Sequence, residues 1–323
     1  MTTRRTVLRG LSAGAAATLA GPAVLAQDST ALTVLVGAAS SMDATARLIA
    51  DQLRASLGRP AVVVSKLGAG QRVALGECKR AAPDGRTLVF ATSGPFSVYP
   101  YIYNKLDYDP VADFTPIAGI SYFDVAIATG PMTGATDLKQ LMEWQRAKQD
   151  AVFASAPGNG SLSHFVGLST SLAANVKMTH VSYKDSGVGI VDLAAGRLPM
   201  LITGLQPMIE MHKAGKIRLL AVSGDVRSPL VPDVPTLKEA GVDVVSSTYT
   251  GVFGPARLPA DLTRRLHDAI APMLSNPQMK EKLAQLAMTP WPATGAEVSA
   301  LLIEERKRFD HLVKASGYKK EDA

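Results

Sequence analysis

The sequence has few of the residues that build covalent or metal-bound sites. Cys78 is the only cysteine among 323 residues, so no intramolecular disulfide can form and no Cys-x-x-Cys pair exists. The five histidines form no His-Glu-x-x-His segment, and nothing else in the sequence supports a zinc site. We therefore expect no metal and no cofactor. Cys78 lies in a helical-looking stretch and is predicted to be a buried structural thiol.

Long hydrophobic runs are also scarce. Residues 11–20 are apolar, but a bilayer-spanning helix needs about 20 such residues. Arg4 and Arg5 precede this run, and small residues suited to cleavage end at Ala26. Residues 1–26 are therefore predicted to be a twin-arginine-type signal peptide, cleaved near Ala26 to release a periplasmic protein. A Sec-type signal with incidental arginines is the alternative.

The charge balance excludes one further class of protein. The formal net charge is +6, and removing Arg4, Arg5 and Arg9 with the signal peptide lowers it to +3. Such a mild excess, without lysines and arginines clustered on one face, gives no footprint for nucleic acid. No nucleic-acid partner is expected.

The sequence does contain a repeated alternation of strand and helix patterns. Buried-strand patterns at residues 32–36, 61–64 and 87–91 are each followed by a loop, and helical spacing resumes after the first two. This alternation indicates a parallel sheet with right-handed crossovers. A strand pattern at residues 123–128 leaves this unit, and the alternation resumes over residues 130–245.

These patterns predict an α/β protein with two lobes, each a mixed or parallel sheet flanked by helices. Lobe 1 is expected to comprise residues 27–128 plus 250–323, and lobe 2 residues 129–249. The chain is expected to cross back near residues 249–255 and to be mostly helical over residues 262–312. Neither crossing has the Ser/Gly-rich composition of a flexible linker, so we expect the lobes to be joined by strands.

Residues 153–164 carry the clearest functional signal. An apolar run enters a Gly-rich turn, small hydroxyl residues follow, and a helical pattern then begins. The start of a helix leaves backbone N–H groups unpaired at the positive end of its dipole, which suits an anion. Similar loops occur at residues 37–43, 93–96, 184–187 and 203–206. Ligands of open α/β sheets bind beyond the carboxyl ends of the strands, so these loops predict a cleft that closes on a small polar molecule.

Catalysis finds little support. Ser161 and His164 are three residues apart at a helix start and could face one side. However, beyond the predicted signal peptide the sequence has no Gly-x-Ser-x-Gly elbow, no Walker motif and no complete Gly-x-Gly-x-x-Gly fingerprint. We interpret His164 as packing or capping locally, and a Ser161/His164 hydrolase is kept as a remote alternative.

Several short segments occur in an order and spacing that are specific in combination. They are Ala-Pro-Asp-Gly at 82–85, Lys-Leu-Asp-Tyr-Asp-Pro at 105–110, Asp-Phe-Thr-Pro at 113–116, Gly-Asn-Gly-Ser at 158–161 with His164, Val-Ser-Tyr-Lys at 181–184 and Pro-Asp-Val-Pro-Thr at 232–236. With them, the chain from about residue 32 to 317 resembles the substrate-binding proteins of tripartite tricarboxylate transporters, the Bug family of periplasmic receptors.

The resemblance implies a Venus flytrap of the type II periplasmic kind. Such a receptor binds a small carboxylate without turnover and docks transiently on membrane transporter subunits. The resemblance also implies that backbone N–H groups and ordered waters hold the carboxylate between the loops of the two lobes. The expected ligand-binding residues are Ala39, Ser40, Ser41, Asp43, Ser93, Gly94, Phe96, Asn159, Gly160, Ser161, His164, Lys184, Asp185 and Thr203. We expect a monomer, and the alternative role is that of a ligand-sensing partner of a membrane sensor kinase.

Two departures from the family pattern bear on ligand choice. Family members usually carry Pro-Pro-Gly-Gly-Gly-Thr before the Asp, whereas this chain has Gly-Ala-Ala-Ser-Ser-Met at residues 37–42, before Asp43. The side chains restrict a backbone that glycines leave free, so ligand preference is expected to differ. Thr203 stands where an Asp is common and offers no partner for an ammonium group, which disfavours an amino-acid ligand.

Two further side chains are candidates for the same cleft. Phe96, with Tyr99, is a candidate wall against an apolar ligand body, and core packing is the alternative for Phe96. Arg72 is a candidate carboxylate fork, and a solvated surface arginine is the alternative.

Overall fold

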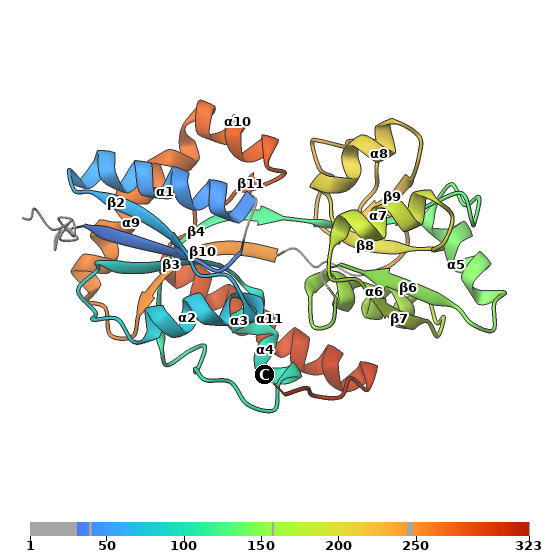
Figure 1. The fold of residues 1–323 in the computed structure, drawn as a ribbon, viewed down its shortest axis with the longest axis horizontal. Helices are drawn as coiled ribbons and strands as arrows, with labels where there is room; N and C mark the ends of the chain where they lie inside the picture. The colour runs from blue at the N-terminus through green and yellow to red at the C-terminus, as the bar shows by residue number, and fades with distance from the viewer. Residues whose placement is uncertain (1–30, 39–40, 157, 244–247, 323) are drawn as a thin grey trace, which may run out of the picture.

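The computed structural model describes residues 31–38, 41–156, 158–243 and 248–322, so the predicted signal peptide lies outside the described residues. Figure 1 shows two α/β lobes side by side, the first in blue, teal and orange and the second in green and yellow. The predicted fold class, a two-lobed α/β protein with helices flanking each sheet, is confirmed. None of the described helices is long and apolar enough to cross a membrane.

The first lobe begins as the strand and helix patterns predict. Its opening elements are β1 (Leu32–Val36), α1 (Ser41–Leu57), β2 (Ala61–Ser65), the 3-10 turn η1 (Ala69–Gln71), α2 (Arg72–Lys79), β3 (Thr87–Thr92), α3 (Gly94–Ser97), α4 (Tyr99–Ile102) and β4 (Phe114–Phe123). The chain then enters the second lobe.

The second lobe repeats the alternation. Its elements are β5 (Val125–Thr129), α5 (Leu138–Arg146), β6 (Val152–Ser155), α6 (Leu162–Ala173), β7 (Thr179–Ser182), α7 (Ser186–Ala194), β8 (Leu201–Gly204), the 3-10 turn η2 (Gln206–Met208), α8 (Ile209–Lys213) and β9 (Arg218–Val222). In the described residues its sheet has five strands in the order β7-β6-β8-β5-β9. β6 is parallel to β7 and β8, whereas β5 is antiparallel to β8 and β9.

The chain returns to the first lobe and completes its sheet. The returning elements are β10 (Thr248–Pro255), α9 (Ala260–Ser275), α10 (Pro277–Gln285), β11 (Thr289–Pro290) and α11 (Gly295–Ser316). Across the described residues, the sheet order is β11-β4-β10-β3-β1-β2. β1 is parallel to β2 and β3, and β10 is antiparallel to β3 and β4. The sheet is therefore mixed because a strand from the late part of the sequence pairs with β3.

The change from the first sheet to the second falls at Asp124, between β4 and β5. The sequence led us to expect it after residue 128, because residues 123–128 read as a single strand leaving the first lobe. The precise division of the chain into lobes stays a prediction, and "first lobe" and "second lobe" below mean the parts built on the six-stranded and the five-stranded sheets.

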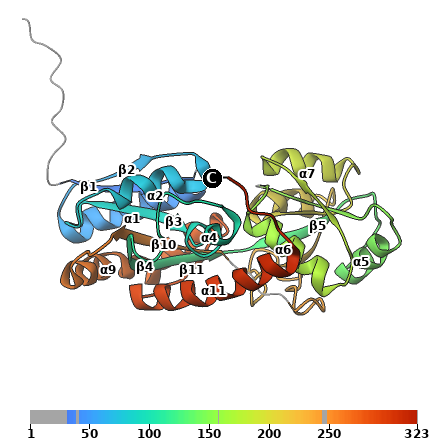
Figure 2. The same ribbon diagram turned by 90° about the horizontal axis from the view of Figure 1, so that it is seen from below.

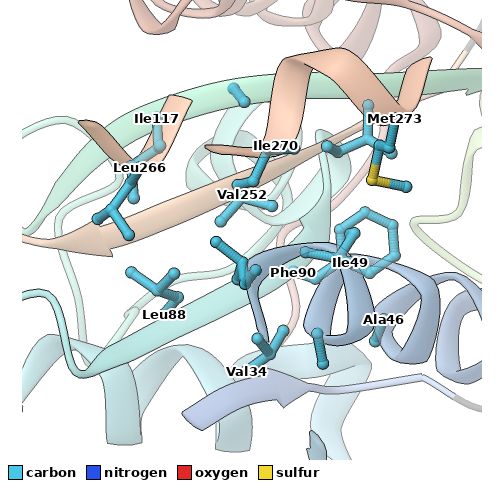
Figure 3. Close-up of a cluster of buried hydrophobic side chains, with 14 of the residues drawn as sticks. Val34, Ala46, Ile49, Leu88, Phe90, Ile117, Val252, Leu266, Ile270 and Met273 are labelled. Atoms are coloured by element: carbon cyan, nitrogen blue, oxygen red, sulfur yellow. The ribbon is translucent and has the colours of Figure 1, made fainter. Parts of the chain in front are cut away.

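A buried apolar layer lies on each face of both sheets. On one face of the first sheet, α1 and α9 pack residues such as Ile49 and Ile270 against Val34, Phe90 and Val252 (Figure 3). α2, α3 and α11 cover the other face. Cys78 is fully buried in that second layer, as predicted. Packing on both faces holds the strand ends, and therefore the loops that follow them, in fixed positions.

The start of α11 is fixed by its own sequence. Thr294 and Glu297 form a reciprocal capping box: the Thr294 hydroxyl accepts a hydrogen bond from the Glu297 N–H, and the Glu297 carboxylate accepts one from the Thr294 N–H. α11 is 22 residues long and runs from the first lobe to the side of α6 in the second (Figure 2). This helix brings the end of the described chain to the junction of the lobes.

Candidate functional site

The loop before α6 is built around a helix start, as the sequence predicts. Gly160 has a left-handed backbone with φ of 72°, which glycine adopts without strain. Ser161 is the N-cap, and its hydroxyl oxygen accepts a hydrogen bond of 3.2 Å from the His164 backbone N–H. The Gly160 N–H donates to the Nδ1 atom of His164 at 3.2 Å. Asn159 is exposed at the tip of this loop.

His164 is a buried, neutral part of this loop. Its ring stacks on that of His180, with centroids 3.9 Å apart, and also lies against Phe153. Burial, together with the neighbouring His180, lowers the pKa of His164 to about 3. Burial likewise lowers the pKa of His180 to about 4, and the Ser155 hydroxyl lies 2.7 Å from its Nε2 atom. Neither ring supplies a positive charge for an anion at neutral pH.

The remaining predicted residues of the second lobe lie around the start of α7. Asp185 is the N-cap of α7, and its carboxylate accepts a hydrogen bond from the Val188 N–H at 3.1 Å. Thr203 is buried, with its hydroxyl 2.7 Å from that of Ser186. Lys184 is exposed just after β7 and places a positively charged side chain at the edge of this loop. The loops before α6 and α7 therefore offer two capped helix starts, with the exposed Lys184 beside the second.

In the first lobe, Asp43 belongs to the first turn of α1. Its carboxylate accepts hydrogen bonds from the Ser65 hydroxyl at 2.7 Å and from the Arg47 Nε at 2.8 Å. The Ser65 hydroxyl first, and then Arg47, hold the pKa of Asp43 below its usual range. Asp43 thus ties α1 to the end of β2. Ser41 begins α1, whereas the predicted Ala39 and Ser40 lie outside the described residues.

The loop after β3 corrects one expectation. Phe96 does not wall a ligand site, because its ring is 1% exposed and stacks on Phe253 with centroids 4.2 Å apart in the core. Ser93 is also buried, and its hydroxyl lies close to the Glu305 carboxylate of α11. Gly94, the first residue of α3, is half-buried. The helical spacing of Phe96 fits either role, and only the position of Phe253 distinguishes them.

Gln71 is a site candidate that sequence analysis missed. It has a left-handed backbone with φ of 74°, which is uncommon for a residue with a side chain. Its amide donates to the Thr92 hydroxyl at 2.6 Å and accepts from the Thr92 N–H at 3.2 Å. A side chain on Gly37 would lie within 2.6 Å of the Gln71 backbone, so these two loops are in contact. The Gly-Ala-Gly-Gln sequence at residues 68–71 is the signal that could have suggested it.

Arg72, the predicted candidate fork, has its guanidinium over the ring of Tyr103, with its carbon 4.4 Å from the ring centroid. Its Nε donates to the carbonyl of Ala69 at 2.8 Å. The side chain therefore braces η1 against α4, and we leave Arg72 out of the proposed site.

The two lobes meet at the α6 loop. A side chain on Gly160 would lie 2.4 Å from the Ile102 side chain of α4. A second contact joins α6 and α11, where the rings of Phe165 and Phe309 pack edge to face with centroids 5.5 Å apart. The Asn159 amide donates to the Glu321 carboxylate at 3.3 Å. The predicted loop of the second lobe is thus held against the first lobe.

Two surface grooves lie away from these loops. One, of about 520 Å³, lies beside β2 and α2 and is lined by Lys66, Glu77 and Arg80 among others. The other, of about 360 Å³, includes His212 and Arg218. None of the predicted ligand-binding residues lines either groove, and we favour the loops because their polar donors follow strand ends. Within the described part of the chain, no group of three or more His, Cys, Asp or Glu could hold a metal ion.

The architecture identifies the class of protein. Two helix-flanked sheets joined by strands, with loops at the strand ends, are the fold of periplasmic binding proteins. The chain belongs to the family of tripartite tricarboxylate transporter receptors, because the model of that family matches residues 45–318. The predicted membership of the Bug group is confirmed, since proteins named BugT and BugD are among its relatives.

Relatives match the chain over most of its length. A UPF0065 protein of Bordetella bronchiseptica is 31% identical over 288 residues, which cover 89% of this chain and 85% of the relative. The Rhodopseudomonas palustris protein Rpa4515, solved with adipate, has a TM-score of 0.80 and 26% identity, and the match covers 91% of this chain and 100% of that one. MatC of the same species, solved with bound malate, has a TM-score of 0.74 and 27% identity, covering 88% and 98% of the two chains.

Proposed function

We propose that this protein is an exported periplasmic receptor that binds a small organic carboxylate between its lobes and delivers it to a membrane transporter of the tripartite tricarboxylate type. Family membership supports the role of solute receptor. The two related receptors solved with adipate and malate support a carboxylate as the ligand class.

The observation that carries the proposal is the start of α6. Ser161 caps the helix at the loop that the family resemblance assigns to the ligand, and Asn159 presents an exposed amide beside it. Neutral N–H donors and the positive end of the helix dipole stabilise an anion without a full counter-charge. The exposed Lys184 adds a cation on the loop after β7.

The geometry gives little support to a Ser161/His164 hydrolase. A serine nucleophile needs a hydrogen bond from its hydroxyl to the ring of a general base. Here the Ser161 hydroxyl accepts from the His164 backbone N–H, and the ring Nδ1 accepts from Gly160. A pKa of about 3 also makes His164 a weak base.

A binding screen tests the proposal. We expect mono-, di- or tricarboxylates to raise the melting temperature, with calorimetric affinity in the micromolar range, about −8 kcal/mol. Amino acids and neutral sugars should have smaller effects. If neutral solutes stabilised the protein and no carboxylate did, the ligand class would be wrong.

A matched pair of lysines locates the site. Lys184 follows β7 at the proposed site, whereas Lys177 precedes the same strand at its opposite end, and both are exposed. Lys184→Ala should weaken carboxylate binding about fivefold, corresponding to roughly 1 kcal/mol for a nearby charge in water. Lys177→Ala should leave the affinity unchanged. Equal effects of the two substitutions would place the ligand elsewhere.

A further inference from the structure

The segment after α11, residues 317–322, lies across the junction of the lobes, and we call it the C-terminal strap. On the first lobe its backbone pairs with the end of α4. The Asn104 N–H donates to the Glu321 carbonyl at 2.8 Å, and the Glu321 N–H donates to the Ile102 carbonyl at 2.8 Å. The Asn104 amide also donates to the Asp322 carboxylate at 3.0 Å, and Lys320 Nζ donates to the Pro100 carbonyl at 3.2 Å.

The same strap contacts the second lobe. The Glu321 carboxylate accepts hydrogen bonds from the Asn159 amide at 3.3 Å and from the Tyr318 hydroxyl at 2.6 Å. The Tyr318 ring lies against His164, with centroids 5.5 Å apart, and against Phe165, at 6.0 Å. Figure 2 shows the strap leaving the end of α11 beside α6 and running to the first lobe.

These contacts place one of the protein's own carboxylates at the loop proposed for the ligand. The Glu321 oxygen that accepts from Asn159 is also the one that accepts from Tyr318. Because the backbone of Glu321 is held on the first lobe, its carboxylate reaches the Asn159 loop as a group tethered to the opposite lobe.

We propose that Glu321 is an affinity-determining residue: its carboxylate competes with the ligand carboxylate for Asn159, and ligand binding releases the strap from the second lobe. This inference rests on the proposed function, because it takes the Asn159 loop to be part of the ligand site. Asn159 cannot serve both carboxylates with the same N–H, and two like charges in one place repel. The strap thereby couples occupancy of the site to a movement at the junction of the lobes.

The size of the effect follows from the exposure of the pair. Asn159 and Glu321 are both exposed, so water screens the charge of Glu321. Two unit charges about 4 Å apart in water repel by about 1 kcal/mol, which corresponds to a fivefold change in affinity. Neutralising Glu321 should therefore tighten carboxylate binding about fivefold, and by less at high salt.

The first experiment needs no ligand. Hydrogen exchange at the backbone N–H of Asn104 reports whether the strap is docked, because that N–H donates a hydrogen bond to the Glu321 carbonyl. Glu321→Ala removes the contacts to Asn159 and Tyr318, and it should speed exchange at Asn104 at least threefold. Lys319→Ala is the matched control, since Lys319 is an exposed strap residue outside these contacts. Unchanged exchange in Glu321→Ala would show that the carboxylate does not hold the strap.

The second experiment measures calorimetric affinity for adipate and malate as probes. Glu321→Gln removes the charge and keeps the shape, and it should tighten binding of whichever probe binds. Asp322→Asn removes the same charge one residue away, where the carboxylate accepts a hydrogen bond from Asn104 of the first lobe, and it should change affinity less than twofold. Unchanged or weaker binding by Glu321→Gln would overturn the competition. If the wild-type protein and all variants bound no carboxylate, the proposed function would fail and competition with it, while the exchange experiment would still decide whether Glu321 anchors the strap.

Discussion

Glu305 should make the protein more stable as the pH falls from 7 to 4.5. The side chain lies on α11, is 4% exposed and lies close to the Ser93 and Ser97 hydroxyls. Its Oε2 atom has no hydrogen-bond partner among the described residues. Burial raises the pKa of Glu305 from 4.5 to about 7, against the opposing effects of Arg308 and the two serines.

The sign follows from proton linkage. The folded protein holds the Glu305 proton more tightly than the unfolded chain, so its stabilising effect is complete below pH 4.5 and is lost as the pH rises through 7. The shift corresponds to about 3 kcal/mol, since each pH unit is worth about 1.4 kcal/mol. At pH 8.5, Glu305→Gln should therefore raise the melting temperature by about 5 °C, given the unfolding entropy of a chain of this size. At pH 4.5 the variant should match the wild type or melt slightly lower.

The assay is thermal unfolding of the wild type and Glu305→Gln across pH 4.5 to 8.5. Glu304→Gln is the control, because it removes a charge from the neighbouring exposed position of the same helix. The melting temperature of this control should change with pH in the same way as that of the wild type. A constant difference between Glu305→Gln and the wild type at all pH values would refute the reasoning, because it would show that the ionisation of Glu305 does not contribute to stability.

Three further predictions concern the loop and the core. Gly160→Ala should lower stability by about 2 kcal/mol and weaken ligand binding, since it adds left-handed strain and a clash with Ile102. The control Gly134→Ala, at a position with φ of 66° and open space around it, should lower stability by only about 1 kcal/mol in the same thermal unfolding experiment. Equal losses of stability would argue against the interlobe contact. Because its folded pKa of about 3 lies below the unfolded value of 6.5, His164 contributes stability that is present above pH 6.5 and is lost as the pH falls toward 3. His164→Asn keeps an acceptor for the Gly160 N–H and should flatten the loss in acid melts, and an unaltered acid limb would assign the loss elsewhere. Tyr249→Phe removes a buried hydroxyl without a partner in the described chain and should change stability by less than about 1 kcal/mol; a loss above about 2 kcal/mol in urea unfolding would reveal a hydrogen bond to that hydroxyl.

Local patterns predicted what depends on neighbours in the sequence. The apolar runs at β1, β2 and β3 form strands, because period and composition describe how each segment buries its own side chains. The Gly-rich turn before α6 was predicted for the same reason: a glycine with positive φ and a serine cap define a helix start within a few residues.

The sequence by itself therefore determined the two-lobed α/β class, the family and the position of a capped helix start at the loop around Ser161. Only the tertiary structure decided which side chains meet there. It places the Phe96 ring on Phe253, His164 on His180, and the Glu321 carboxylate on Asn159, 162 positions earlier in the chain. Such pairs carry no local periodicity, because they form only when separate elements pack and their side chains fill the same space.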